Sequence, residues 1–177
     1  MRNLRLYALA VALTVLCGPP AALGQDQRPE TVRDTHGDWE IRCVDGSEVC
    51  VMSQTGQGPT GTDVLEVRIR KLEGVTTDEG QAVPAAIQIS APLGVLLRGG
   101  VQMKIDQNEP RIAPFEICVP NRCLVRDVLS DDLVGQMRAG SVATMTVFSP
   151  NQGEVAVNIS LRGFTRAFQT LQPLQQR

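Results

Sequence analysis

Four cysteines arranged as two close pairs constrain this chain more than any other feature. Cys43 and Cys50 flank one short polar segment, and Cys118 and Cys123 flank another. A fifth cysteine, Cys17, lies in an apolar N-terminal stretch that we expect to be removed. Close pairs of this kind are typical of disulfide-stapled hairpins in exported proteins. They predict a rigid β domain outside the cytoplasm, but they do not predict a reaction.

The first 24 residues have the pattern of a secretory signal peptide. Arg2 and Arg5 supply the positive end, residues 6–16 form an uncharged apolar run, and small residues precede a cleavage site near Gly24. The run is shorter than the roughly 20 residues that a membrane-spanning helix needs, so we favour cleavage over a retained anchor helix. The mature protein is therefore expected to be periplasmic or secreted.

The mature chain has the length of one ordinary domain. Removing residues 1–24 leaves 153 of the 177 residues, and the leader holds two of the 17 basic residues and none of the 19 acidic ones, so the formal charge becomes −4. The sequence has no run of basic residues, which argues against nucleic acid as a partner. Beyond the leader it has no other long apolar segment, so no membrane span is expected in the mature chain. We expect a flexible arm over residues 25–36 and a single domain over residues 37–172.

Alternation of aliphatic and polar side chains dominates the domain. It is clearest over residues 39–43, 65–70, 101–106 and 155–162. Period-two alternation predicts strands with one buried face and one wet face, which is typical of antiparallel sheets. Turn residues such as Asp45-Gly46 separate the strands.

Two segments carry helical signals instead. Ser130 can cap a helix over residues 131–138, and Gly140 can end it. Apolar residues also recur every three or four positions from Phe164 to Leu171. The predicted fold class is therefore all-β, a mostly antiparallel β-sandwich with one short inserted helix and a C-terminal helix.

Four cysteines permit three disulfide pairings, and turn geometry favours the local one. If the first pair flanks a four-residue turn, Cys43 faces Cys50 directly. Pro120-Asn121 suits the centre of a tight turn between Cys118 and Cys123. Each bridge should then contribute about 2–3 kcal/mol of stability.

The alternatives for these cysteines are a zinc site and a redox centre. Spacings of six and four residues within the pairs depart from the usual zinc-ligand spacings, and no Cys-x-x-Cys motif is present. We predict no metal and no cofactor.

Catalytic chemistry finds little support in the residues. His36 is the single histidine and is expected to be a solvated loop residue, and no serine lies in a Gly-x-Ser-x-Gly motif. Asp131 and Asp132 could serve acid-based chemistry, but adjacent acids at a helix start more often complement the helix dipole. Trp39 is expected to be a core anchor, with a ligand platform as the alternative.

An ordered set of short segments resembles the invasion-associated locus B family, exported proteins of alphaproteobacteria. The matching segments are residues 37–39, 42–43, 50–54, 92–97, 100–106, 118 with 123, 133–134, 137–140 and 161–164. The family name reflects a link between one member and entry into host red cells. The resemblance implies an exported envelope protein, and it supplies no catalytic or binding residue to transfer.

The aliphatic run between Pro92 and Val101 is the strongest candidate for a role beyond folding. It is either a strand buried on both faces, with the C-terminal helix as the cover, or a surface that meets a partner. The candidate partner surface consists of Leu93, Val95, Leu96, Leu97 and Arg98.

We therefore favour an exported, non-enzymatic binding protein whose partner is an unidentified envelope or host protein. The alternative is an acid-based, hydrolase-like envelope enzyme whose site forms only in three dimensions. The sequence does not give the oligomeric state.

Overall fold

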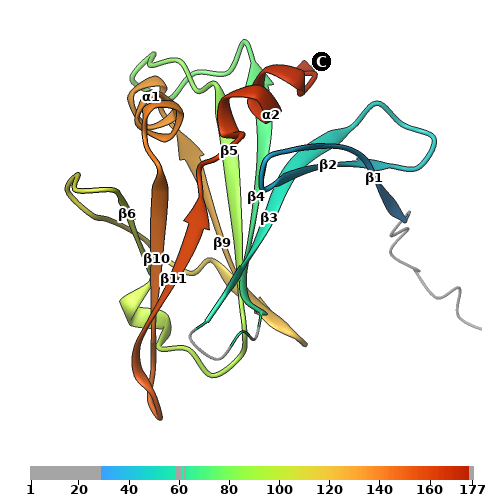
Figure 1. Ribbon diagram of the computed structural model, residues 1–177. Helices are drawn as coiled ribbons and strands as arrows, with labels where there is room; N and C mark the ends of the chain where they lie inside the picture. The colour runs from blue at the N-terminus through green and yellow to red at the C-terminus, as the bar shows by residue number, and fades with distance from the viewer. Residues whose placement is uncertain (1–28, 59–60, 62, 176–177) are drawn as a thin grey trace, which may run out of the picture.

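Two antiparallel sheets stack their aliphatic faces against each other in the computed structural model of the chain (Figure 1). The structure describes residues 29–58, 61 and 63–175. The predicted signal peptide and its cleavage site near Gly24 lie outside these residues. The predicted all-β sandwich with two helices is confirmed.

The larger sheet has eight strands in the order β1-β2-β3-β4-β5-β9-β8, with β12 pairing in parallel to β4. Its strands are β1 (Glu30–His36), β2 (Trp39–Val44), β3 (Cys50–Gln57), β4 (Asp63–Glu73), β5 (Ala85–Ala91), β8 (Ile117–Val119), β9 (Arg122–Leu129) and β12 (Leu174–Gln175). Both cysteine hairpins belong to this sheet, in the register that their turns predict: Cys43 lies opposite Cys50, and Cys118 lies opposite Cys123.

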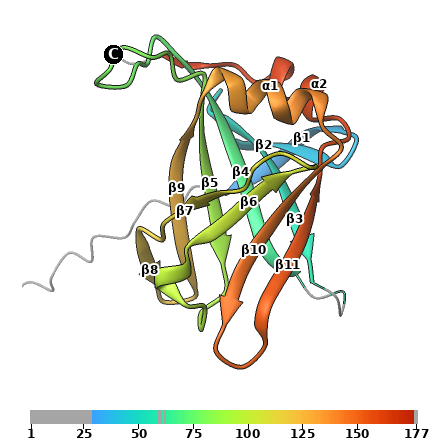
Figure 2. The same ribbon diagram turned by 90° about the vertical axis from the view of Figure 1, so that its left-hand side faces the viewer.

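The smaller sheet has four strands in the order β11-β10-β6-β7. Its strands are β6 (Val101–Ile105), β7 (Arg111–Ala113), β10 (Val142–Ser149) and β11 (Gly153–Ser160). A 3-10 turn, η1 (Leu97–Gly99), precedes β6. Both α-helices, α1 (Asp131–Ala139) and α2 (Phe164–Thr170), lie at one end of the sandwich (Figure 2). No helix in the described part of the chain is long and apolar enough to cross a membrane.

A capping signal explains α1, and burial of an apolar face explains α2. The Ser130 hydroxyl accepts a hydrogen bond from the Leu133 backbone N–H (3.3 Å), and Gly140 ends α1. Helix α2 buries Phe164 and Phe168, and the Phe164 ring packs edge-on against Trp39 at 5.5 Å between ring centroids. Trp39 is fully buried, as expected of a core anchor.

The predicted flexible arm over residues 25–36 is wrong for its second part. Glu30–His36 form β1, which pairs antiparallel with β2 and is the edge of the larger sheet. Most β1 side chains are exposed, so no apolar alternation marks the strand in the sequence. Backbone pairing to β2 orders it instead.

Candidate functional site

The aliphatic segment over residues 93–97 is not a buried strand. It forms an irregular loop that leads into η1, and the side chains of Leu93, Leu96 and Leu97 are 52%, 48% and 52% exposed. Pro92 lacks a backbone donor, and Gly94 adopts φ +88°, so the chain cannot continue as a strand there. Of the two alternatives for this segment, the strand buried on both faces is therefore wrong.

The loop is held to the smaller sheet by its backbone. The Leu96 N–H donates to the Phe148 carbonyl (2.7 Å), and Val95 packs partly against the core. The side chain of Ile112 on β7 lies beside Gly100, the residue that follows η1, and Ile112 is 63% exposed. We call Leu93, Leu96, Leu97 and Ile112 the apolar end. Arg98 is exposed beside it.

Helix α2 does not cover the apolar end. It follows β11 at the opposite end of the sandwich, where it packs on α1, β1 and β2 (Figure 1). The apolar residues Phe164 and Phe168 of the helix, and Leu171 directly after it, are buried in the core that contains Trp39. The C-terminal helix therefore does not supply the cover that the buried-strand alternative required, because it packs at the end of the sandwich where β11 finishes.

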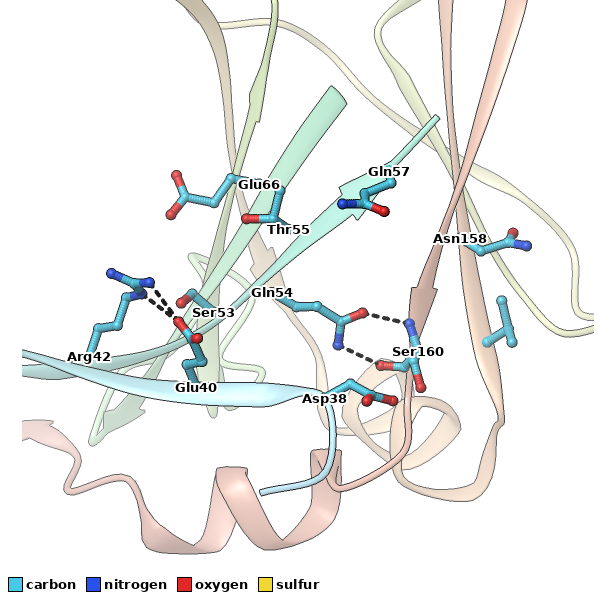
Figure 3. A pocket seen from close by; sticks show the side chains of 11 residues that line it. Asp38, Glu40, Arg42, Ser53, Gln54, Thr55, Gln57, Glu66, Asn158 and Ser160 are labelled. Atoms are coloured by element: carbon cyan, nitrogen blue, oxygen red, sulfur yellow. Dashed lines mark hydrogen bonds and ion pairs between the residues drawn. The ribbon is translucent and has the colours of Figure 1, made fainter. Parts of the chain in front are cut away.

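A second candidate is a polar groove of about 610 Å³ where β3 passes β11 (Figure 3). At its centre, the Gln54 side chain accepts from the Ser160 N–H (2.7 Å) and donates to the Ser160 carbonyl (3.0 Å). The Trp39 indole N–H donates to the same carbonyl (2.9 Å). The side-chain amide of Gln54 thus pairs with the backbone of Ser160 as the backbone of a neighbouring strand would. This pairing joins β3 of the larger sheet to β11 of the smaller one.

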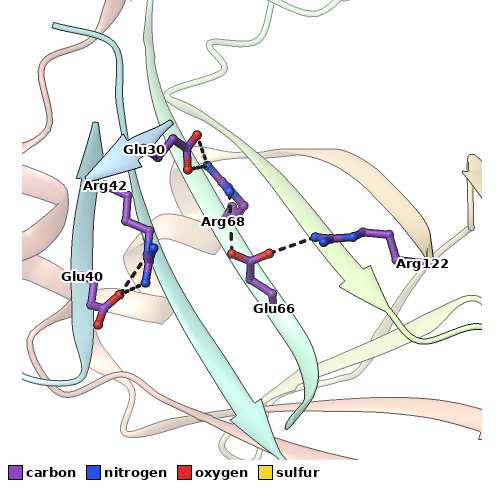
Figure 4. A network of polar contacts seen from close by, with 6 residues as sticks. All are labelled: Glu30, Glu40, Arg42, Glu66, Arg68 and Arg122. Carbon is purple, nitrogen blue, oxygen red and sulfur yellow. Dashed lines mark hydrogen bonds and ion pairs between the residues drawn. The ribbon is translucent and has the colours of Figure 1, made fainter. Parts of the chain in front are cut away.

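The acids of the groove are paired with arginines (Figure 4). Glu40 accepts from Arg42 at 2.6 and 2.9 Å. Glu66 lies 3.4 Å from Arg122 and 3.7 Å from Arg68. Each of these carboxylates is held by a guanidinium in a charge-assisted contact. The groove therefore has the chemistry of a structural ion-pair network.

Asp38 at the groove rim is paired as well. Its carboxylate accepts two hydrogen bonds from the Arg162 guanidinium, at 2.5 and 3.1 Å. The hydrogen bond from Arg162, followed by that from Ser160, holds the pKa of Asp38 below the usual range of an aspartic acid. Asp38 is therefore ionised at neutral pH and is unsuited to proton donation.

This pKa makes part of the stability dependent on pH. A carboxyl whose pKa is lower in the folded state stabilises the fold above its unfolded-state pKa and loses that effect as the pH falls through its folded-state pKa. We expect Asp38→Asn to be less stable than wild type at pH 7, with the difference shrinking below about pH 4. Urea unfolding of both proteins at pH 7 and pH 3 measures this. A difference that stays the same at both pH values would contradict the assignment.

The remaining candidate residues do not converge on a site. The structure bonds Cys43 to Cys50 and Cys118 to Cys123, so none of these four sulfurs is available as a nucleophile or metal ligand. Asp131 lies in the first turn of α1. Among the described residues, no three His, Cys, Asp or Glu side chains are grouped so that they could hold a metal ion.

His36 differs from the solvated loop residue that the sequence predicts. It ends β1, its side chain is only 13% exposed, and its Nε2 lies 3.0 Å from Thr170 Oγ1 and 3.1 Å from Asp34 Oδ2. Both contacts use the same ring nitrogen. A serine-type relay uses both nitrogens, so this arrangement fastens β1 to α2 and does not resemble a catalytic triad.

With this geometry in view, comparison with known proteins is decisive for the family. The sequence profile of the Invasion associated locus B (IalB) protein family matches residues 39–172. This chain belongs to the IalB family. It is 30% identical over 180 residues to an invasion protein B homolog of Brucella abortus strain 2308, covering 98% of this chain and 99% of that protein.

Two further relatives agree with the IalB assignment. Invasion protein B of Bartonella bacilliformis is 27% identical over 154 residues, covering 82% of this chain and 77% of that protein. The crystal structure of invasion associated protein b from Bartonella henselae superposes with a TM-score of 0.63 at 22% identity, covering 78% of this chain and 94% of that one. The likeness to the crystal structure shows a shared fold.

The segments that carry the IalB resemblance pack against one another. Residues 37–39 contact residues 161–164: the Asp38 N–H donates to the Arg162 carbonyl (3.1 Å), and a Cβ on Gly37 would overlap that carbonyl. Asp106 accepts from the backbone N–H groups of Ser141 and Val142, each at 3.0 Å. These IalB segments therefore help to build the fold, and Asp38, Arg42 and Gln54 from three of them also line the polar groove.

Two features could not be predicted from the sequence: the part of Ile112 in the apolar end, and the arrangement of the arginines on the larger sheet. Ile112 gives no signal because it is a single aliphatic residue in a short polar strand. The arginines on the outer face of β4, Arg68 and Arg70, alternate with buried residues as any wet strand face would. Their arrangement depends on which side chains the neighbouring strands place beside them.

Proposed function

We propose that this IalB-family chain is a non-enzymatic binding protein, exported through a leader at residues 1–24 and acting in the periplasm or outside the cell. The two disulfides support an oxidising compartment. Relatives in Brucella and Bartonella carry the name invasion protein B, which supports an envelope or host protein as the partner. We propose that residues 37–172, together with the edge strand β1, form the single domain of the mature protein.

The observation that carries the proposal is the apolar end. It holds three leucines and an isoleucine, each about half exposed or more, on a rigid sandwich stapled by disulfides. The three leucines lie within five residues of one loop, and exposed aliphatic side chains gathered in this way are costly in water and mark interaction sites on soluble domains. Arg98 at its edge supplies the polar rim that such interfaces usually have. The partner should present a complementary apolar surface.

The paired acids weigh against the enzyme alternative. Asp38, Glu40 and Glu66 each face an arginine, and no observation singles out one of them as a proton donor. An acid-based hydrolase needs two carboxyls with separated pKa values. A binding role requires no such pair.

The test is capture of partners by mature protein in crosslinked periplasmic extract. Leu96→Asp and Leu97→Asp should fold normally, with unfolding free energies within about 0.5 kcal/mol of wild type, because exposed side chains contribute little to the core. Each should lose a partner that wild type retains, since a charge in an apolar contact stays desolvated and unpaired.

Val128→Asp is the matched control. Val128 is 44% exposed on β9, away from the apolar end. Its replacement by aspartate introduces the same charge as the Leu96 and Leu97 variants do. It should capture the partner as wild type does. Equal capture by the Leu96 and Leu97 variants would contradict the proposal, as would equal loss in the Val128 variant.

A further inference from the structure

The outer face of the larger sheet curls into a broad concave cavity. Glu30 on β1 binds Arg68 on β4, with both carboxylate oxygens 2.6 Å from Nη2 (Figure 4). These strands are three positions apart in the sheet, which in a flat sheet would separate them by about 14 Å. The sheet must therefore curl so that β1 reaches over β4. The cavity beneath has a volume of about 1410 Å³.

This cavity is basic although the chain as a whole is acidic. Arg68, Arg70, Arg122 and Arg126 line it, against only two acids, Glu30 and Asp127. The lining thus carries an excess of two positive charges, whereas the full chain has a formal charge of −2. A concave surface with low-dielectric walls strengthens the field of such an excess.

Three of these arginines already have carboxylate partners. Arg68 binds Glu30, and Arg122 lies 3.4 Å from Glu66. Arg126 lies 3.2 Å from Glu116. A guanidinium that already faces a carboxylate has little net charge to offer a ligand, so the positive charge that remains available is the single charge of the fourth arginine, Arg70.

Arg70 has no hydrogen bond or ion pair within the described part of the chain, although it is partly buried. The strand register explains this. Arg70 lies opposite Ala86 on β5, and Ala86 lies opposite Val128 on β9. On the other side, the pairing of Met52 with Ile69 places Val51 beside Arg70. Its neighbours across both strands are apolar and cannot neutralise it.

An unpaired, partly buried cation is unfavourable unless something else binds it. Burial, and next the charge of Arg68, lower the pKa of Arg70, and the charge of Glu30 offsets only part of this lowering. Gln88 lies opposite Arg68, two residues along β5 from Ala86 and on the same face of the strand. Its side chain also has no hydrogen bond among the described residues, so it offers a further donor beside Arg70.

We propose that Arg70 is the anchor of a phosphate-binding site in this cavity. A guanidinium binds a phosphate through paired N–H groups, and a phosphate monoester carries about −1.5 to −2 charges at neutral pH, so it supplies the negative charge that the strand neighbours of Arg70 do not. The cavity lining contains no aromatic side chain for stacking a sugar ring, so the phosphate itself supplies the recognition. This site is separate from the apolar end and does not rest on the proposed function.

The test is titration of the mature protein with phosphate compounds, and the readout is the ¹⁵N NMR signals of the arginine side chains. Inorganic phosphate and glycerol 3-phosphate serve as probes, with chloride at matched ionic strength as the reference. The Nε–H signal of Arg70, identified by its absence in Arg70→Gln, should shift and saturate. Arg70→Gln should weaken phosphate binding at least about tenfold, as expected for loss of a charge-assisted hydrogen bond.

Arg166→Gln is the matched control, since Arg166 on α2 is an exposed arginine outside both the cavity and the apolar end, and its guanidinium also lacks a partner among the described residues. It should bind phosphate within about twofold of wild type. Equal weakening in both variants, or shifts that follow ionic strength alone, would overturn the proposal. Arg70→Gln should unfold at a urea concentration no lower than wild type, because it removes an unpaired charge, so lost binding cannot reflect lost folding.

Vesicles distinguish the source of the phosphate. Retention on vesicles that contain phosphatidic acid, lost in Arg70→Gln but not in Arg166→Gln, identifies a lipid headgroup. Binding of glycerol 3-phosphate without retention on vesicles identifies a small soluble ligand. Failure of both the vesicles and the soluble probes would overturn the proposal and leave the role of the apolar end unaffected.

Discussion

Replacing Trp39 with alanine is expected to destabilise the domain by about 3–5 kcal/mol, the range for truncating a large aromatic residue in a packed core. Trp39 is fully buried and packs against Phe164, which ties β2 to α2. Its indole N–H also binds the Ser160 carbonyl on β11. One side chain therefore joins both sheets and a helix. Urea unfolding followed by circular dichroism measures the loss, since the variant has no tryptophan to report.

Trp39→Phe separates packing from hydrogen bonding. Phenylalanine keeps a ring against Phe164 and loses only the indole donor, while the Ser160 carbonyl retains its bond from Gln54. We expect this variant to lose less than half of the free energy lost in Trp39→Ala. A cost below about 1 kcal/mol for Trp39→Ala would show that the junction does not depend on this residue.

Replacing Gly163 with alanine is expected to cost about 2–4 kcal/mol, although it adds only one methyl group. Gly163 adopts φ +88°, where side chains are disfavoured, and a Cβ there would overlap the backbone carbonyl of His36. Backbone atoms on both sides cannot move aside as the end of a flexible side chain could. The turn after β11 would have to separate from the turn before β2.

Gly135→Ala is the matched control for this substitution. Gly135 lies inside α1, and a Cβ there would meet nothing within 4 Å. Alanine should stabilise this helix by about 0.5–1 kcal/mol. Unfolding free energies of both variants test the pair, and equal effects would contradict the packing described for residues 37 and 163.

Features with local causes were predictable from the sequence. The two cysteine hairpins follow from their turn residues, and α1 follows from the Ser130 cap and Gly140. Strand β1 was not predictable, because an edge strand with exposed side chains has no apolar pattern and depends on backbone pairing to β2.

Features that depend on distant segments were beyond the sequence. An aliphatic run such as residues 93–97 is compatible with burial or exposure, and only the position of α2 at the other end leaves it open. Arg70 lies on the wet side of its strand like Arg68. Its lack of a partner results from Ala86 and its other apolar neighbours, which the pairing of β4 with β3 and β5 places beside it.

Site-specific photo-crosslinking in living cells tests most directly whether the apolar end is a binding surface. A photoreactive phenylalanine analogue would replace Leu97 in one strain and Val128 in another, both exposed apolar positions. We predict that light produces a discrete crosslinked species in the envelope fraction or culture medium from position 97 and none from position 128. The same species from both positions, or no species from position 97, would contradict the proposed binding role of the apolar end.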